Sequence, residues 1–91
     1  MAMIVTRIQV GDYDTWKTLF DQDVPGARRS ARGYRILRNV DDPGEVFVQV
    51  DFDSIDEAKA ARERLLASGV LDRFEDRMLP RVVEEAEAVG R

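Results

Sequence analysis

YRILRNVDDPGEVFVQVDF, residues 34–52, is the stretch of sequence that decides the fold. Residues 34–39 alternate between apolar and polar side chains, which is typical of a half-buried strand. Residues 45–52 alternate again and place four apolar side chains on one face: Val46, Val48, Val50 and Phe52. The cluster between them, Asp41, Asp42, Pro43 and Gly44, consists of residue types that break strands and form turns. The stretch therefore predicts an antiparallel hairpin.

A helix follows the hairpin toward the C-terminus. Ser54, with Glu57 three residues later, is a capping box. The residues after it form a narrow apolar face at helical spacing: Ile55, Ala58, Ala61, Arg62, Leu65 and Leu66. Ser68 and Gly69 are expected to end this helix. Val70, Phe74 and Met78 then recur every four residues, which predicts one or two further helical turns before Pro80.

A strand and a helix precede the hairpin. Residues 3–10 are rich in β-branched side chains and alternate, with one face formed by Ile4, Thr6, Ile8 and Val10 and the other by Val5, Arg7 and Gln9. Gly11 breaks the strand and Asp12 can cap the helix that follows. Four apolar side chains of that helix fall at helical spacing and form an aromatic stripe: Tyr13, Trp16, Leu19 and Phe20.

The end of this first helix is predicted from residue types that break or terminate helices. Val24 precedes Pro25, a position that disfavours helical geometry, so a kink or a second short helix is expected there. Arg28 and Arg29 suit a helix C-terminus, and Gly33 is placed to terminate the helix, which should end by Arg32.

The residues after Pro80 give two conflicting signals, one for a helix and one for a strand. Val82, Ala86 and Val89 fit helical spacing, whereas the Val82–Val83 pair favours a strand. The order strand, helix, strand, strand, helix lacks one strand of a βαββαβ arrangement, and a right-handed second crossover supplies it. We therefore predict a strand over residues 81–88. The expected fold class is α+β: a ferredoxin-like, four-stranded antiparallel sheet with both helices on one face.

Composition limits the classes of function. The 91 residues predict one domain, 1–91, and a net charge of −4 offers no long-range attraction to nucleic acid or an anionic membrane. The chain has no cysteine, which excludes disulfides and thiolate chemistry. The N-terminal residues lack the features of a signal peptide, and no membrane-spanning stretch is present. A cytoplasmic protein is expected.

A homodimer is expected from the face of the sheet that the helices leave uncovered. Val5, Leu37 and Phe47 lie on the side of their strands away from the predicted core. A sheet with apolar groups on both faces needs a second cover, which another copy of the chain would supply. The alternative is that single apolar side chains are simply exposed, as is common.

The chain resembles a known superfamily in its pattern of residues. The resemblance lies in the helix string Asp12-Tyr13-Asp14-Thr15-Trp16-Lys17 to Phe20, the Tyr34 hairpin with Asp42-Pro43-Gly44, and Phe52-Asp53-Ser54 before the second helix. These features are similar to the dimeric α/β-barrel superfamily, which includes the antibiotic biosynthesis monooxygenase-like proteins. The resemblance covers nearly the whole chain but includes no catalytic motif.

The resemblance implies a subunit whose sheet packs against its twin, with a small cavity between helices and sheet. Activities in the superfamily include cofactor-free oxygenation of aromatic polyketides and quinols, haem degradation, cyclisation and chlorite decomposition. Haem-degrading relatives use a histidine as the iron ligand. This chain has no histidine, which argues against that branch.

Four aromatic residues are the candidate substrate-binding residues: Tyr13, Trp16, Phe20 and Tyr34. They could line a pocket for a planar substrate, with a phenol or indole N–H orienting a ligand oxygen. The alternative is ordinary core, which an aromatic stripe at helical spacing forms more often.

Two sets of charged residues have both a functional and a structural interpretation. Asp51 and Asp53 could bind a divalent cation or share acid-base work, but capping of the second helix is the simpler interpretation. Five arginines could form an anion site or a solvated helix end: Arg28, Arg29, Arg32, Arg35 and Arg38. Strand alternation places Arg35 and Arg38 on opposite faces, so the five cannot form one patch.

The sequence therefore leaves two functions open. One is a small-molecule-handling homodimer that acts as a cofactor-independent monooxygenase on an aromatic or quinol-type substrate. The other is a non-catalytic dimeric ligand-binding or accessory module. No cofactor or metal is expected, because no nucleotide-binding, hydrolase or metal-binding motif is present. Nucleic acid and membranes are not expected as partners, because the net charge is −4.

Overall fold

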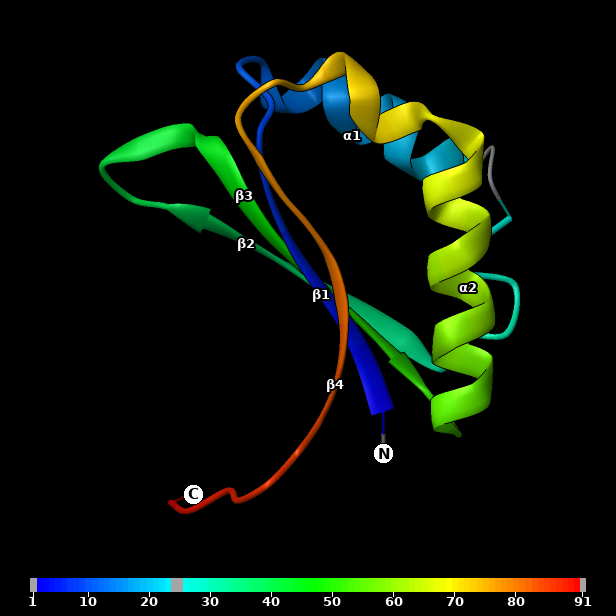
Figure 1. Ribbon diagram of the computed structural model, residues 1–91. Coiled ribbons are helices and arrows are strands. Elements are labelled where there is room, and N and C mark those ends of the chain that lie inside the picture. Colours follow the sequence, from blue (N-terminus) through cyan, green and yellow to red (C-terminus); the bar gives the residue numbers. More distant parts are fainter. Residues whose placement is uncertain (1, 24–25, 91) are drawn as a thin grey trace.

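A computed structural model describes residues 2–23 and 26–90, which form a four-stranded antiparallel sheet covered by two helices. The strands have the spatial order β2-β3-β1-β4. The elements are β1 (Ala2–Gln9), α1 (Tyr13–Gln22), β2 (Gly33–Asn39), β3 (Asp42–Phe52), α2 (Ile55–Ser68), the 3₁₀ helix η1 (Val70–Arg73) and β4 (Arg77–Glu84). Both helices lie on the same face of the sheet (Figure 1). The predicted ferredoxin-like fold is confirmed.

The inner face of the sheet follows the predicted alternation. Ala2, Ile4, Thr6 and Ile8 of β1 are buried, and so are Val46, Val48, Val50 and Phe52 of β3. The register pairs Ile4 with Val50, Thr6 with Val48 and Ile8 with Val46. Because successive side chains of a strand point to opposite faces, these pairs form one apolar layer beneath the helices.

The two helices lie at different distances from that layer. Helix α2 packs closely on the sheet, because its buried positions, Ala58 and Ala61, are small. Helix α1 stands further off, with the bulky Trp16 as its one buried residue. Both predicted caps are confirmed: Asp12 accepts from the Thr15 N–H at 3.3 Å, and Ser54 accepts from the Glu57 N–H at 3.1 Å. The sheet is consequently less tightly covered beneath α1.

The hairpin is confirmed, but its turn lies earlier than the Asp41–Gly44 cluster predicts. The turn residues are Val40 and Asp41, and β3 already begins at Asp42. Asn39 pairs with Asp42 and Arg38 with Val46, so residues 43–45 form a bulge. Gly44 lies in this bulge, where a Cβ atom would be 2.9 Å from the carbonyl oxygen of Gly11. Glycine permits this close approach.

Helix α1 is shorter than predicted and ends at Gln22, well before Arg32. Asp23 takes a left-handed conformation (φ 46°, ψ 49°), and its N–H donates to the carbonyl of Phe20. The kink predicted at Val24 and Pro25 lies outside the described residues. Residues 27–30 form turns and not a second helix, and Gly33 begins β2.

The final crossover also differs from the prediction. The spacing of Val70, Phe74 and Met78 suggests α-helical turns, yet only residues 70–73 are helical, as a 3₁₀ turn that buries Leu71. Phe74 is extended and Met78 lies in β4.

The fourth strand exists, but it spans Arg77–Glu84 and not residues 81–88. Pro80 lies inside it, which is possible because β4 is an edge strand with a bulge opposite Thr6. Residues 85–90 continue as an extension away from the sheet (Figure 1).

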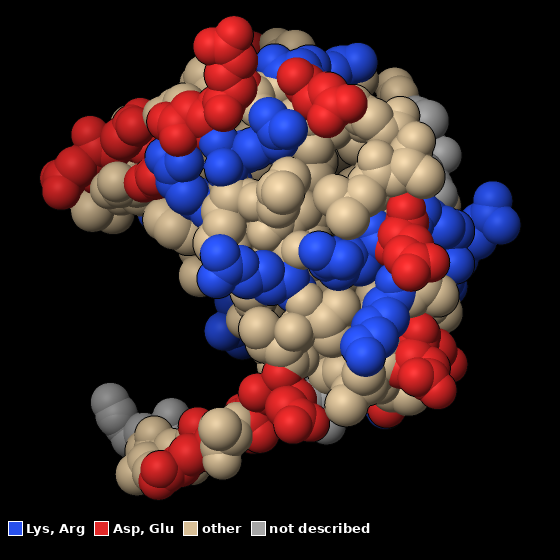
Figure 2. Space-filling view, in the orientation of Figure 1, with Lys and Arg blue, Asp and Glu red and all other residues tan. Residues whose placement is uncertain are grey.

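Charged residues of both signs are interspersed on the face seen in Figure 2, and acidic side chains gather along the C-terminal extension. This extension carries Glu85 and Glu87 next to Glu84 at the end of β4. Within the part of the chain that the structure describes, no helix is both long and apolar enough to cross a membrane.

A polar network crosses the outer face of the sheet at one end. The Arg7 guanidinium pairs with Glu45 through Nε and with Asp76 through Nη1 at 2.6 Å, and Asn39 donates to Glu45 at 2.8 Å. The hydrogen bonds from Asn39 and Arg7 lower the pKa of Glu45, and the hydrogen bond from Arg7 lowers the pKa of Asp76. Both carboxyl groups thus favour the folded state when they are ionised.

Acid is expected to destabilise the protein partly through this network. A lowered pKa stabilises the fold above the unfolded value, about 4 for a carboxyl group, and that stabilisation disappears as the pH falls through the folded pKa. Arg7→Met removes a cause of both pKa shifts. Its urea midpoint should therefore fall less between about pH 5 and pH 2 than that of the wild-type protein. Arg64→Met, on the exposed side of α2, is the control and should behave as wild type. Equal acid dependence of Arg7→Met and wild type would contradict a stabilising role for the network.

Candidate functional site

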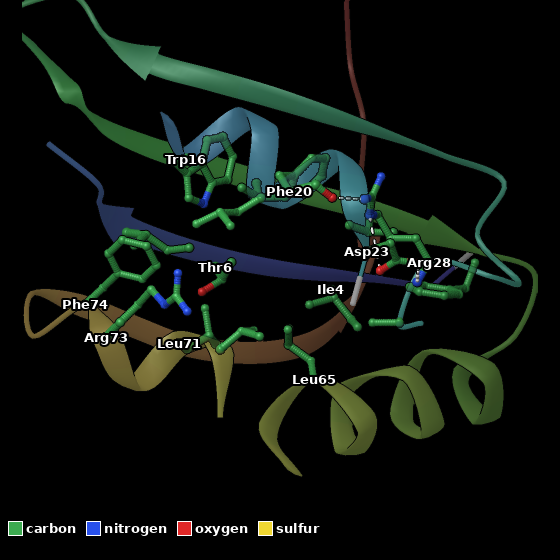
Figure 3. Close-up of a pocket in the computed structure, with 17 residues that line it drawn as sticks. Ile4, Thr6, Trp16, Phe20, Asp23, Arg28, Leu65, Leu71, Arg73 and Phe74 are labelled. Carbon is green, nitrogen blue, oxygen red and sulfur yellow. Dashed lines mark hydrogen bonds and ion pairs between the residues drawn. The ribbon is translucent and has the colours of Figure 1, made fainter. Parts of the chain in front are cut away.

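A cavity of about 210 Å³ lies between α1, η1 and the inner face of the sheet (Figure 3). Its floor consists of inward side chains of β1 and β3: Ile4, Thr6, Ile8, Val48, Val50 and Phe52. Trp16 and Phe20 form the wall on the side of α1, and Leu71 and Phe74 form the wall beside η1. The cavity exists because α1 stands away from the sheet and no side chain fills the space below it. Its lining is mainly apolar, as is usual for small-molecule sites.

The four candidate aromatic residues form one connected cluster, and two of them line the cavity. The rings of Trp16 and Phe20 lie 5.1 Å apart between centroids and both face the cavity. Tyr34 packs edge-on against Phe20 at 5.1 Å, and Tyr13 packs against Trp16 at 5.7 Å. The two tyrosines are not among the residues that line the cavity, so they support the rings that do.

Arg28 closes the end of the cavity beside the C-terminus of α1. Its guanidinium lies 3.9 Å from the centroid of the Phe20 ring and 5.3 Å from that of Tyr34, within the range of cation–π contact. It also donates through Nη2 to the carbonyl of Phe20. Asp23 lies 3.7 Å from Arg28 Nε, and its carboxylate accepts from the Arg28 backbone N–H at 3.2 Å. Asp23 and Arg28 therefore neutralise each other.

Three further groups give the cavity its polar character. Thr6 is buried, and its hydroxyl donates to the carbonyl of Met78 at 2.5 Å. The indole N–H of Trp16 donates to no residue that the structure describes, and Figure 3 shows it facing the space between α1 and η1. Arg73 reaches this space from η1 and lines the cavity together with Thr6 and Trp16.

The two aspartates do not form a metal site. Asp51 lies on the outer face and accepts from Gln49 Nε2 at 3.2 Å, whereas Asp53 pairs with Arg32 at 2.8 Å. Capping of α2 is performed by Ser54. Over residues 2–23 and 26–90, no group of three His, Cys, Asp or Glu side chains could hold a metal ion.

The five arginines are dispersed, as the alternation predicts. Arg38 faces inward, 4.6 Å from the Tyr13 ring centroid, whereas Arg35 lies on the opposite face beside Gln49. Arg28 lies beside the C-terminal carbonyl of α1, although the residues around it form turns.

Sequence reasoning missed Thr6, Asp23 and Arg73 as cavity residues. Thr6 had a detectable signal, because it is a polar residue on the otherwise apolar face of β1. Asp23 and Arg73 gave none, since their places depend on a left-handed cap and on a 3₁₀ turn that helical spacing did not predict.

Three solved structures have a fold similar to that of this chain. A candidate antibiotic biosynthesis monooxygenase from Deinococcus radiodurans has a TM-score of 0.65 at 13% identity, over 100% of this chain and 98% of its own. Rv0793 from Mycobacterium tuberculosis has a TM-score of 0.68 at 13% identity, over 98% of each chain. A point variant of MhuD, with two manganese protoporphyrin IX molecules bound per active site, has a TM-score of 0.67 at 18% identity over 100% of each chain.

The chain has the fold of the antibiotic biosynthesis monooxygenase-like proteins. No protein-family model and no curated protein matches the sequence. At identities of 13–18%, the likeness to these structures is one of fold, because fold similarity does not carry chemistry with it. The chemistry of this chain therefore depends on the residues of its own cavity.

Proposed function

We propose that the chain binds a small aromatic molecule in the cavity beneath α1 and acts as a cofactor-independent monooxygenase on an aromatic or quinol-type substrate. The observation that carries this proposal is the apolar cavity, walled on one side by Trp16 and Phe20. Flat rings pack well against such aromatic walls, and the free indole N–H of Trp16 could orient a ligand oxygen.

The volume of the cavity limits the substrate. A cavity of about 150 Å³ lined by apolar side chains holds benzene. At about 210 Å³, this cavity suits one aromatic ring or two fused rings. Drug-sized ligands occupy pockets of about 300 Å³ or more, so a polycyclic substrate would require α1 to move.

A haem does not fit this site. Haem iron takes its axial ligand from His, Cys, Met or Tyr. The chain has no histidine or cysteine, and no methionine or tyrosine lines the cavity. A porphyrin therefore takes no part in the proposed reaction.

Oxygenation without a cofactor requires a substrate that supplies its own electrons. For an anthrone-type ketone or the keto tautomer of a quinol, loss of a proton from the ring CH₂ gives a carbanion that donates electrons to O₂. One oxygen atom then becomes a carbonyl oxygen of the product, and the other leaves as water with the two hydrogens of the oxidised carbon. Orientation of the substrate is the main contribution that the protein must make.

Oxygen uptake with one- and two-ring quinols, and with anthrone as the three-ring compound, tests this proposal, with ¹⁸O₂ to follow the incorporated atom. One- and two-ring substrates should be consumed and the three-ring compound should not. Trp16→Phe keeps a ring but removes the N–H donor, and should lower kcat/KM by about tenfold, the worth of one hydrogen bond.

Val40→Ala is the control for this experiment, because Val40 lies in the β2–β3 turn and is 92% exposed. It should retain full turnover. Unchanged turnover in Trp16→Phe would refute the role of the indole, and absence of ¹⁸O from every product would refute the oxygenase.

One observation favours a non-catalytic ligand-binding or accessory module as the second candidate. The cavity is smaller than the about 300 Å³ typical of small-molecule sites, and Asp23, its one carboxylate, is paired with Arg28. In this case aromatic ligands would bind near Trp16 without any oxygen uptake.

The proposal also includes a homodimer formed through the outer face of the sheet. Leu37 and Phe47 pair across β2 and β3 and are 52% and 40% exposed. Val5 lies on the same face of β1. Arg7, which pairs with Glu45 and Asp76, lies directly across from Phe47, and Gln49 lies across from Val5. Protein interfaces commonly combine such apolar side chains with polar groups.

A further inference from the structure

The charged residues that line the cavity leave one cation without a partner. The lining contains three charged side chains, Asp23, Arg28 and Arg73. Asp23 and Arg28 are paired with each other. Arg73 forms no ion pair or side-chain hydrogen bond with any residue in 2–23 or 26–90. Its sequence neighbour Asp72 lies instead 3.6 Å from Arg77.

Two hydrogen-bond donors of the cavity differ in whether they already have an acceptor. The Thr6 hydroxyl already donates to Met78. The Trp16 indole N–H has no acceptor among the described residues, and it faces the same space as the Arg73 guanidinium (Figure 3). A ligand oxygen placed between α1 and η1 would therefore meet a cation on one side and an N–H donor on the other.

We infer that the cavity selects aromatic ligands that carry an anionic oxygen group, with Arg73 as the specificity-determining residue. The inference rests on the proposed function, because it assumes that the cavity binds an aromatic ring. The ring would lie on the floor of β1 and β3 beside Trp16 and Phe20, and the anionic group would lie toward η1, next to Arg73. A guanidinium is well suited to this contact because it is always charged and offers several N–H donors.

The experiment compares 2-naphthoate with its neutral analogue 2-naphthamide on the full chain by isothermal titration calorimetry. Both have two fused rings, so they differ in charge and not in ring size. Trp16 is the single tryptophan, and its indole N–H resonance reports on binding inside the cavity. For the wild-type protein, 2-naphthoate should bind about tenfold more tightly than the amide, the worth of one charge-assisted hydrogen bond at a partly exposed site.

Variants at position 73 test the assignment directly. Arg73→Met should bind both compounds equally, whereas Arg73→Lys should still prefer the anion. Arg64→Met removes the same charge from the exposed side of α2 and should keep the wild-type preference. Since Arg73 is exposed, its replacement should leave folding intact.

The outcomes separate the inference from the proposed function. Equal affinity of the wild-type protein for both compounds, with a shifted Trp16 resonance, would overturn the inference and leave the aromatic cavity standing. An equal loss of preference in Arg64→Met would also overturn it, because the effect would then be one of net charge. No shift of the Trp16 resonance with either compound would overturn the proposed function and the inference with it.

Discussion

Phe52→Ala is expected to cost about 3–5 kcal/mol of unfolding free energy, a large part of the roughly 5–13 kcal/mol expected for a chain of this size. Phe52 is fully buried at the end of β3, where it forms part of the cavity floor. Its removal would leave a void that the surrounding strands cannot close, because both β1 and α2 are held by their own register and caps.

Urea unfolding followed by circular dichroism measures this effect. Val40→Ala, at an exposed turn position, is the control and should change stability by no more than about 0.5 kcal/mol. Protein concentration must be held constant, because association would add to the apparent stability. A loss below about 1 kcal/mol in Phe52→Ala would mean that the core lies elsewhere.

Phe47→Asp is expected to convert the proposed homodimer into monomers. Phe47 lies on the same strand as Phe52 but on the opposite face, beside Leu37. In a two-fold interface each substitution occurs twice, so two carboxylates would be buried at several kcal/mol each, and Arg7, directly across from position 47, is already paired with Glu45 and Asp76. The dissociation constant should therefore rise by roughly a thousandfold or more.

Light scattering at micromolar concentration measures the change, since the wild-type mass should be twice the chain mass of 10.4 kDa. Val40→Asp adds the same charge at the hairpin turn and should remain dimeric. The monomer should stay folded, because Phe47 is 40% exposed in the isolated subunit and an aspartate there is solvated. A monomeric wild-type protein would refute the dimer, and a dimeric Phe47→Asp would refute this face as its interface.

Several elements of the fold follow from local signals in the sequence. Three features could be predicted from the sequence: the alternation in β1 and β3, the Asp12 cap and the Ser54 capping box. Each depends on residues only a few positions apart. The fourth strand was predicted from the order of elements. Its position was not, because Pro80 argues against a strand interior until an edge and a bulge accommodate it.

The cavity, in contrast, could not be predicted from local signals. The aromatic stripe predicted Trp16 and Phe20 as neighbours, but not that α1 would stand away from the sheet and leave space beneath them. Arg73 became a cavity residue only because η1 is a tight 3₁₀ turn, whereas the spacing of Val70, Phe74 and Met78 favoured a continued helix. Such placements depend on contacts between elements that are distant in the sequence.

The sequence by itself determined the order of the elements, the inner face of the sheet and the absence of histidine and cysteine chemistry, because these follow from residue identity and periodicity. The tertiary structure alone decided that two of the four aromatic residues line a cavity and that Asp23 neutralises Arg28. It also brought Arg73 to the same space as the Trp16 indole. These outcomes depend on how closely each helix packs on the sheet, a property of side-chain volumes in contact and not of any single segment.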